Sequence, residues 1–327
     1  MNPDASIFAS DGHLEVTDKS NNSSTLSLTM TKLSISSAAF FCVLLLSGGA
    51  RGQIVVCGLP KLVRSSDVVA VAQVVGVTQT GSGAIEFPPS HPILARFRVA
   101  NLHLRDVLKG TPASADITVP YTVLYSPAGW AGGIPWGYTI RDSLTPNSIR
   151  LIFLKSVGAR YEFTNGSYLS VVCAPEAPSS RQLLDPLDRV LSRITAALFS
   201  TSVPRQEKAE AIWQLGAVEE DSVVAALRTF LRGDVAAKDE SLRIDVLTAL
   251  VGGHKDMSVV EAAESELLSG STSYSKCNLV YSFAAVVPRS CSFPILTRLL
   301  DSASPEIRTC AGAAADQAAR FSALHER

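Results

Sequence analysis

The chain has no excess of charge of either sign. Its 29 Lys and Arg residues are balanced by 30 Asp and Glu residues, which gives a formal net charge of −1 at pH 7. The basic residues also form no cluster along the sequence. Because proteins that bind nucleic acid concentrate Lys and Arg on one face, the sequence predicts that nucleic acid is not a partner.

The sequence also lacks the motifs of the common catalytic and metal sites. It contains no G-x-S-x-G, no H-E-x-x-H, no C-x-x-C and no glycine-rich loop that cradles phosphate. The acidic run Glu219-Glu220-Asp221 precedes Ser222, where negative charge favours a helix N-terminus, so we expect a solvated turn there. No histidine stands at metal-ligand spacing from another His, Cys or carboxylate; the five are His13, His91, His103, His254 and His325. We therefore expect no enzyme activity, no catalytic residue, no cofactor and no metal ion.

A membrane-spanning run is missing near the N-terminus. Ala38–Leu46 has nine apolar residues, whereas a spanning helix needs about 20. This run follows Met30-Thr-Lys32 and precedes the small residues of 47–52, an order typical of a signal peptide. We expect a signal peptide over 30–52, export to the periplasm or the extracellular space, and no membrane span after cleavage. The polar segment 1–29 is expected to be disordered, or to lie upstream of a true start at Met30.

The C-terminal half of the chain repeats itself. Ser222-Val-Val-Ala-Ala-Leu recurs 36 residues later from Ser258, and Ser292-Phe-Pro-Ile-Leu follows after 34 more. Each Ser is expected to cap the N-terminus of a helix. Partner helices are expected at 205–216, 239–252, 275–287 and 305–320. One such pair cannot bury its apolar stripe alone, so the pairs are expected to stack as an α-solenoid over 204–321, followed by a tail at 322–327.

Two phrases in this half, Asp239-Glu-Ser-Leu-Arg243 and Ser304-Pro-Glu-Ile-Arg308, resemble short HEAT-type repeats. In that family an Arg near the start of the helix bonds neighbouring turns, so the resemblance implies a repeat-stabilising role for Arg243 and Arg308. A tetratricopeptide array is the alternative, since 34 residues is its period. The run 181–199 is apolar on one face and is expected to cap the first repeat, within a connecting segment at 179–203.

The first domain, expected over 53–178, is rich in β-forming residues. After a short helix near 59–66, strands are expected at 67–78, 93–104, 116–123, 149–155, 160–163 and 168–173. The second of them places Phe97 and Val99 on one side and Arg96 and Arg98 on the other. Because closure removes exposed edges, we expect a small five- to six-stranded β-barrel. The predicted fold class is therefore multi-domain β + α, a β-barrel followed by an α-solenoid.

Two short motifs support a resemblance for this domain. Val107-Leu-Lys109-Gly110 after an alternating strand, and Ser66-Asp67-Val-Val before the first strand, resemble oligonucleotide/oligosaccharide-binding-type barrels of bacterial secreted proteins. Those barrels are similar to the netrin and metalloprotease-inhibitor module. In the inhibitors an N-terminal Cys chelates the zinc of the protease, but Cys57 lies about four residues after the expected cleavage point. That role is therefore not carried over to Cys57.

The loop Ser126–Pro146 is long, rich in glycine and aromatic, with Trp130, Trp136 and Tyr138. Long loops without regular structure are often functional. Exposed rings on a barrel rim stack on sugars or peptides, so these three residues are candidate binding-loop aromatics. The alternative is that the rings plug one end of the barrel.

Export would make disulfides possible, and five cysteines remain after Cys42 leaves with the signal peptide. Cys57 and Cys173 bracket the first domain, and we pair them. Cys277 and Cys291 lie on the two helices of one repeat and are paired as a second bridge, which leaves Cys310. Buried free thiols in the helical part are the alternative, because connectivity does not follow from sequence.

Together these features favour an exported, non-catalytic protein-binding or scaffold protein whose partner is another protein on the solenoid face. Two alternatives stay open. Short HEAT-type repeats resemble those of phycobilin lyases, which implies a lyase-like or enzyme-accessory role. The barrel resemblance implies protease inhibition as the second alternative.

Overall fold

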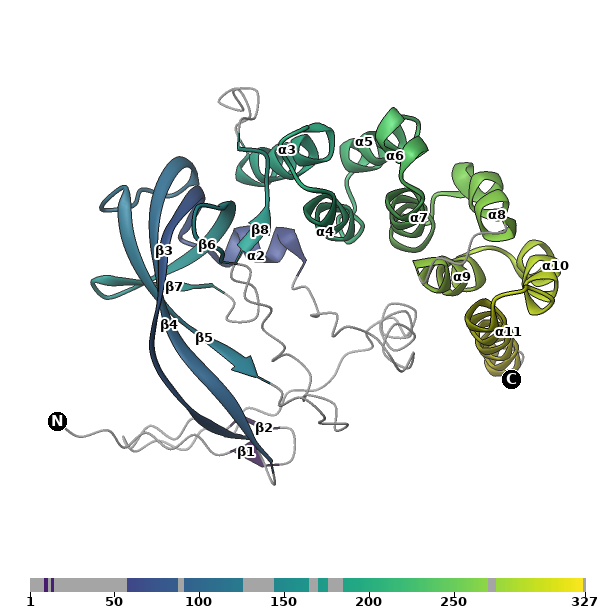
Figure 1. The fold of residues 1–327 in the computed structure, drawn as a ribbon, viewed down its shortest axis with the longest axis horizontal. Helices are drawn as coiled ribbons and strands as arrows, with labels where there is room; N and C mark the ends of the chain where they lie inside the picture. Colours follow the sequence, from purple (N-terminus) through teal and green to yellow (C-terminus); the bar gives the residue numbers. More distant parts are fainter. Residues whose placement is uncertain are drawn as a thin grey trace.

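The computed structural model describes residues 9–10, 13–14, 58–87, 91–125, 144–164, 170–175, 185–269 and 275–325. A two-stranded pair, β1 (Ala9–Ser10) and β2 (His13–Leu14), precedes an antiparallel sheet domain, and a helical domain follows it (Figure 1). The predicted signal peptide, Cys57 and the loop aromatics Trp130, Trp136 and Tyr138 lie outside the described residues. Within the described ranges, no helix combines the length and the apolar character that a membrane crossing requires.

The sheet domain begins with the short helix α2 (Leu59–Ser65). Its strands are β3 (Val68–Phe87), β4 (His91–Lys109), β5 (Asp116–Tyr125), β6 (Ile149–Val157), β7 (Arg160–Phe163) and β8 (Ser170–Val172). They form the order β5-β4-β3-β6-β7, and β8 pairs with the first part of β6. Each of the six predicted strands therefore has a counterpart in the sheet, although β3 and β4 run several residues beyond the predicted ends.

The predicted closed barrel is wrong, because the sheet stays open between β5 and β7. β7 has only four residues, and β5 pairs with the part of β4 from Leu94 to His103. This stagger leaves the two edge strands without a common ladder in the described part of the sheet. The two strands still contact each other, for example through the edge-to-face contact of Tyr121 and Phe163 at 6.0 Å between ring centroids.

The central strands are buried on both faces of the sheet. Val68, Ala70 and Ala72 of β3 face an inner core that includes Ile152 and Leu154 of β6. The alternate residues face the other way, into a core shared with the helices; they are Val69, Val71, Leu151 and Phe153. Burial on both faces explains why the first part of β3 and the first part of β6 are continuous apolar runs. A strand with one exposed face would instead alternate apolar and polar residues.

The helical domain contains α3 (Pro186–Phe199), α4 (Arg205–Leu215), α5 (Asp221–Leu231), α6 (Asp234–Lys238), α7 (Glu240–Thr248), α8 (Val260–Leu268), α9 (Ser275–Val286), α10 (Arg289–Leu300) and α11 (Pro305–His325). A π-helical turn, Ala249–Gly253, extends α7, and a 3₁₀ turn, Met257–Val259, leads into α8.

The partner helices start close to the predicted positions. The predicted Ser caps are wrong, because α5 begins at Asp221 and α10 at Arg289, so Ser222 and Ser292 lie inside the helices.

The helices stack in two rows. In one row α4 packs on α7, α7 on α9 and α9 on α11. The other row holds α3, α5, α8 and α10, and each helix of this row packs on a helix of the first (Figure 1). We call α4, α7, α9 and α11 the inner row, because Figure 1 shows them on the concave side of the arc, toward the sheet. Consecutive pairs thus bury their apolar stripes against one another.

Three arginines join the sheet to the first helical pair. Arg193 of α3 is buried and pairs with Asp106 of β4. Arg189 donates to the carbonyl oxygens of Val107 and Leu108 at 2.9 and 2.7 Å. From the sheet side, Arg150 of β6 donates to Glu207 of α4 at 3.0 Å. These contacts surround the shared apolar core, so the two halves form one continuous packed body.

Candidate functional site

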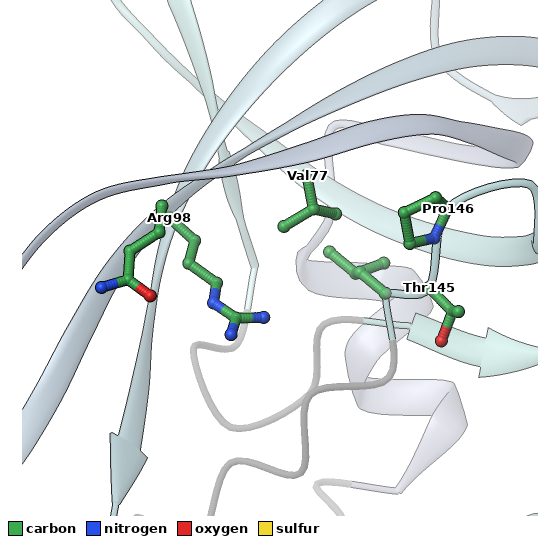
Figure 2. Close-up of a pocket in the computed structure, with 6 residues that line it drawn as sticks. Val77, Arg98, Thr145 and Pro146 are labelled. Carbon is green, nitrogen blue, oxygen red and sulfur yellow. The ribbon is translucent and has the colours of Figure 1, made fainter.

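A pocket of about 350 Å³ opens on the sheet where β3 and β6 part (Figure 2). The walls come from β3, β4 and the turn before β6; the lining residues are Val77, Gln79, Arg98, Leu144, Thr145 and Pro146. Figure 2 shows Val77 and Arg98 extending from the sheet toward the turn that carries Thr145 and Pro146. The lining therefore combines three apolar residues with Gln79, Thr145 and one guanidinium group.

The local backbone explains why the pocket forms there. The ladder of β3 with β6 ends at Gln73 and Ile149, and the last bonds join Val74 to Asn147 and Ser148 at 2.7 and 2.9 Å. Asn147 has φ 68°, a left-handed conformation that Asn tolerates better than most residues. The chain before it turns away from β3 and leaves the pocket between the strand and Leu144.

Arg98 lies in the pocket because β4 turns its arginine face inward. Arg98 pairs with Gln79 across the strands, and Arg96 pairs with Ser82. Phe97 on the opposite face is 41% exposed, whereas the two arginines are half-buried. Sequence alternation separated these two faces, but it gave no signal that the arginine face would be the inner one.

The loop predicted to carry the binding aromatics begins and ends on the sheet domain. The segment that carries Trp130, Trp136 and Tyr138 leaves the described residues after Tyr125, the end of β5. It returns at Leu144, which lines the pocket. The structure therefore places both ends of this loop on the sheet domain, and the aromatic residues themselves remain a prediction.

Ion pairs and hydrogen bonds connect the helices both within a pair and between successive pairs. Arg205 of α4 donates to Asp239 at the start of α7 at 2.5 Å, and Arg243 of α7 donates to Glu266 of α8 at 2.6 Å. On the outer row, Arg228 of α5 makes two bonds of 2.7 Å to Asp256. The Arg228 guanidinium holds the pKa of the Asp256 carboxyl at about 2. This pairing keeps Asp256 ionised at neutral pH.

A buried lysine completes the junction between α7, α8 and α9. Lys276 is 1% exposed, and its ammonium group donates to the carbonyl oxygen and the hydroxyl of Ser269 at 2.8 and 2.7 Å. Glu240 lies 3.9 Å from the same nitrogen. Burial lowers the pKa of Lys276, and Glu240 and Glu266 oppose that change. The hydrogen bonds offset the cost of burying the charge.

The two arginines singled out by the repeat resemblance make equivalent contacts. Arg243 donates to the carbonyl oxygens of Ala236 and Ala237 at 3.1 and 3.3 Å. Arg308 donates to Ser302 and Ala303 at 2.6 and 3.2 Å. Each guanidinium thus binds carbonyl groups of the segment just before its own helix, where carbonyls would otherwise lack partners.

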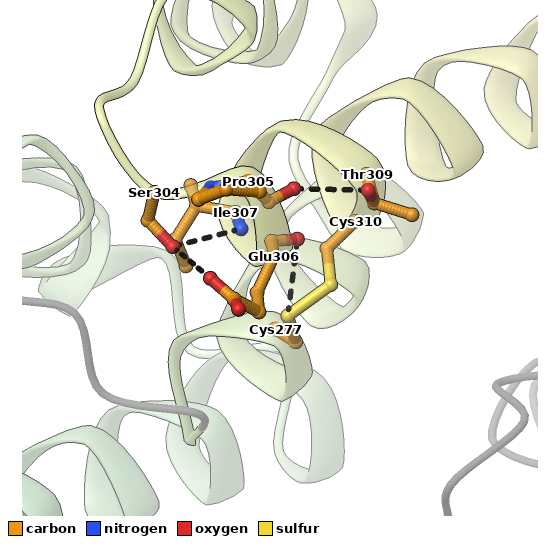
Figure 3. Close-up of a disulfide and its surroundings, with 7 residues drawn as sticks. All are labelled: Cys277, Ser304, Pro305, Glu306, Ile307, Thr309 and Cys310. Atoms are coloured by element: carbon orange, nitrogen blue, oxygen red, sulfur yellow. Dashed lines mark hydrogen bonds between the residues drawn. A yellow bond between two sulfur atoms is a disulfide. The ribbon is translucent and has the colours of Figure 1, made fainter.

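The last junction is covalent. Cys277 of α9 is bonded to Cys310 of α11, with Cα atoms 5.6 Å apart (Figure 3). Beside the bridge, the Ser304 hydroxyl donates to Glu306 at 2.7 Å and accepts from the Ile307 backbone N–H at 3.4 Å, which caps α11. The stack is thus connected at every junction from α4 to α11.

This disulfide corrects the predicted pairing of Cys277 with Cys291. The two residues lie near the starts of α9 and α10, which are consecutive helices joined by a tight turn. Nine residues of helix from Cys277 to the end of α9 span about 14 Å, well beyond the roughly 7 Å limit for Cα atoms in a disulfide. Cys310 instead lies in the second turn of α11, the next helix of the inner row, and this turn lies beside the start of α9.

The remaining cysteines in the described part of the chain are free thiols. Cys173 is buried and Cys291 is exposed. Cys173 belongs to the apolar core shared by sheet and helices, and Cys57, its predicted partner, lies outside the described residues. Burial raises the pKa of the Cys173 thiol to about 12, although Arg193 and Arg150 act in the opposite direction.

A second buried group with a shifted pKa is Asp245 of α7. Its residue is 7% exposed, and burial raises the pKa of its carboxyl to about 7. Arg205 opposes this shift and Asp239 adds to it.

Two of the histidines lie in the described residues with a resolved contact or pKa shift. His103 bonds Asp116 at 2.8 Å on an exposed part of the sheet, and burial lowers the pKa of His254. Over the described ranges, no group of three or more His, Cys, Asp or Glu side chains is placed to hold a metal ion.

No protein-family model matches this chain, and no curated protein matches it. The described residues offer two candidate binding surfaces, the inner helical row and the sheet pocket.

Proposed function

We propose that this protein is an exported, non-catalytic binding scaffold whose helical pairs form a short HEAT-like array. The observation that carries the proposal is the connection of every successive helical pair from α4 to α11 by an ion pair or a disulfide: Arg205–Asp239, Glu240–Lys276 and Cys277–Cys310. Such connections favour a stack that keeps its curvature, and stacks of this kind use their concave side for binding. The partner would be another protein that meets the inner row.

The disulfide in the same stack supports the export that we propose. Cys277–Cys310 bridges two helices that already pack together, and disulfides form and persist in oxidising compartments. This bridge supports an extracytoplasmic location, in keeping with the signal peptide expected over 30–52.

Site-specific photo-crosslinking in the producing cells tests the proposal. A photoreactive amino acid replaces the exposed residues Gln206, Ala285 and Ala313 of the inner row, one at a time. Matched controls on the outer row are Thr229, Glu261 and Thr297, which are also exposed. We expect a common crosslinked protein from the inner positions and none from the outer ones. Crosslinking without preference for the inner row would contradict the proposal.

A further inference from the structure

Three sides of α4 pack against other elements, and the fourth is the inner face of the stack. One side packs on α3. Arg205, which bonds Asp239, and Gly216, one helix turn from the end, face α7. Glu207 faces the sheet, since Arg150 bonds it. Helical spacing leaves a fourth side at positions i, i+4, i+7 and i+11; its residues are Gln206, Glu210, Trp213 and Ala217. The first and last of these are exposed and the middle two are half-buried.

The corresponding face of the other inner helices follows from their register. The buried pair Ala211-Ile212 of α4 corresponds to Val246-Leu247 of α7 and to Leu279-Val280 of α9. The inner positions are therefore Ser241, Asp245, Thr248 and Gly252 on α7, Asn278, Tyr281 and Ala285 on α9, and Glu306, Cys310, Ala313 and Gln317 on α11. No Lys or Arg stands at any of these positions on the four helices. The inner face therefore has acidic residues and no basic ones.

Asp245 lies in the groove between α4 and α7. It precedes Ala249, which meets Gly216, by one helix turn. The disulfide gives independent support for this placement, because Cys310 of α11 has the register position of Asp245 and is bonded to the preceding inner helix. The equivalent neighbour of Asp245 on α4 is the small residue Ala209. Asp245 is 7% exposed, so its carboxyl group is held within this groove.

The carboxyl of Asp245 has no cation of its own. Arg205 donates to Asp239 at 2.5 Å, and among the described residues no Lys or Arg nitrogen lies within 4.0 Å of Asp245. Arg205, Asp239 and an ionised Asp245 therefore carry a net charge of −1. A buried carboxylate is stable only when it is paired, so a further cation in the groove would stabilise it.

The groove on the other side of α4 has the same imbalance. Arg150 lies 3.0 Å from Glu207 and 3.9 Å from Glu210, so one guanidinium serves two carboxylates. Lys208 does not correct the deficit, because it is two residues, or about 200° of helix rotation, before Glu210. Charge complementarity therefore favours a positively charged ligand on the inner face of α4.

Trp213 gives the groove an aromatic wall. It is half-buried, and it lies four residues after Ala209 and three before Gly216, on the α7 side of the inner face. Long side chains on a helix lean toward its N-terminus, which brings the indole toward the level of Asp245. A guanidinium group can stack on an indole and donate to a carboxylate at the same time, whereas an ammonium group has no planar face.

We propose that the groove between α4 and α7 binds an arginine side chain from an extended basic segment of the partner protein, between the carboxylate of Asp245 and the ring of Trp213. This inference deepens the proposed function and rests on it, because it takes the inner row as the binding surface. It adds the chemistry of the partner, which the array alone does not define.

Synthetic octapeptides test the proposal on the full chain. The probe alternates Arg and Ser and is acetylated and amidated; the control peptides carry Lys or Glu in place of Arg. In fluorescence anisotropy at pH 7.5 we expect the Arg peptide to bind about fivefold more tightly than the Lys peptide. The Glu peptide should not bind, because it brings a carboxylate to a face that lacks cations.

The binding should also depend on pH. Free Asp245 holds its proton until about pH 7, and a bound arginine favours the carboxylate, so binding releases a proton. The affinity for the Arg peptide should fall about twentyfold from pH 7.5 to pH 5.5. Arg205 and Asp239, which act on this carboxyl, stay charged over the range, because their ion pair raises the pKa of Arg205 and lowers that of Asp239. His254 lies more than two helix turns away along α7.

Protein variants assign the effect to the groove. Asp245→Asn keeps the shape of the protonated side chain, and it should weaken the Arg peptide about tenfold at pH 7.5 and flatten the pH profile. Asp234→Asn, an exposed aspartate on α6, is the matched control and should change neither. Trp213→Leu should remove the preference for Arg over Lys, which gives a second readout if Asp245→Asn does not fold.

Three results would overturn the inference: equal binding of the Arg and Glu peptides, an unchanged pH profile in Asp245→Asn, or an equal loss of affinity in Asp234→Asn. Failure of the peptides with intact crosslinking from Gln206, Ala285 and Ala313 would reject only the arginine site. Crosslinking without preference for the inner row would reject the proposed function itself.

Discussion

A Cβ atom at Gly253 would lie 2.0 Å from the carbonyl oxygen of Gly216. The end of α4 and the π-helical end of α7 therefore touch through their backbones, and no side chain fits between them. A Cβ at Gly216 would also lie 3.0 Å from the Cβ of Ala249. This close approach fixes the spacing of the first two helices of the inner row.

We predict that Gly253→Ala lowers the free energy of unfolding by about 1–3 kcal/mol, because the new methyl group must push the two helix ends apart. Urea denaturation of the purified chain measures the change. Gly76→Ala is the matched control, since nothing lies within 4 Å of a Cβ built there. Equal midpoints for the two variants would show that the contact is more tolerant than its geometry indicates.

The buried carboxyl of Asp245 predicts a pH dependence of stability. The unfolded chain releases this proton near pH 4, whereas the folded protein holds it until about pH 7. Between these values the folded state binds one more proton, so the free energy of unfolding falls as the pH rises. Asp245→Asn should remove this contribution, which is about 2–4 kcal/mol across the window. Chemical denaturation at pH 4.5 and pH 8 measures it, and parallel pH profiles for variant and parent would contradict it.

The cysteines predict a labelling pattern. Native alkylation should modify the exposed Cys291 quickly, whereas the buried Cys173 should react only after unfolding. Cys277 and Cys310 should react only after reduction. Peptide mass spectrometry distinguishes the four sites, and modification of Cys310 without a reductant would contradict the bridge.

Removing the bridge should weaken the end of the helical stack. Cys277→Ser with Cys310→Ser should lower the free energy of unfolding by about 2–4 kcal/mol, the usual range for a disulfide. Cys291→Ser serves as the control because its thiol is exposed and unbridged. An equal loss for the control would assign the effect to cysteine replacement rather than to the bridge.

Local patterns predicted the strands and the partner helices, because apolar periodicity and turn residues act over short distances. The part of β3 beyond residue 78 could not be predicted, because it depends on a contact with another strand. Gly81-Ser82-Gly83 suggests a loop, yet Phe97 of β4 lies across both glycines, 3.5 and 3.4 Å from the positions their Cβ atoms would take. An aromatic side chain from the next strand thus supports a stretch whose own residues favour a turn.

The errors in pairing have a common cause. Barrel closure depends on the stagger of β5 against β7, and the disulfide depends on which helices become neighbours in the inner row. Both are contacts between segments far apart in the chain, and no local pattern encodes them. The pocket was missed for the same reason, because Leu144 and Arg98 meet only after β3, β4 and β6 have assembled.

The pair Arg193–Asp106 allows a test of whether sheet and helices unfold together. Arg193 is 8% exposed and belongs to α3, while Asp106 lies on β4. We predict that Arg193→Met lowers the free energy of unfolding by about 1.5–3 kcal/mol, the range for a hydrogen bond to a charged group. Arg160→Met, which breaks the exposed pair with Glu162, should cost about 0–1 kcal/mol.

The reason for expecting one transition is the apolar core that surrounds this pair. Phe153 of β6 and Ile194 of α3 belong to the same buried cluster, so the loss of the ion pair weakens a junction that apolar contacts still hold. Hydrogen exchange should therefore accelerate in β6 and in α7 by the same factor in Arg193→Met. A double-mutant cycle with Asp106→Asn isolates the pair itself. Acceleration confined to the sheet would show that the two halves unfold separately and that the shared core does not couple them.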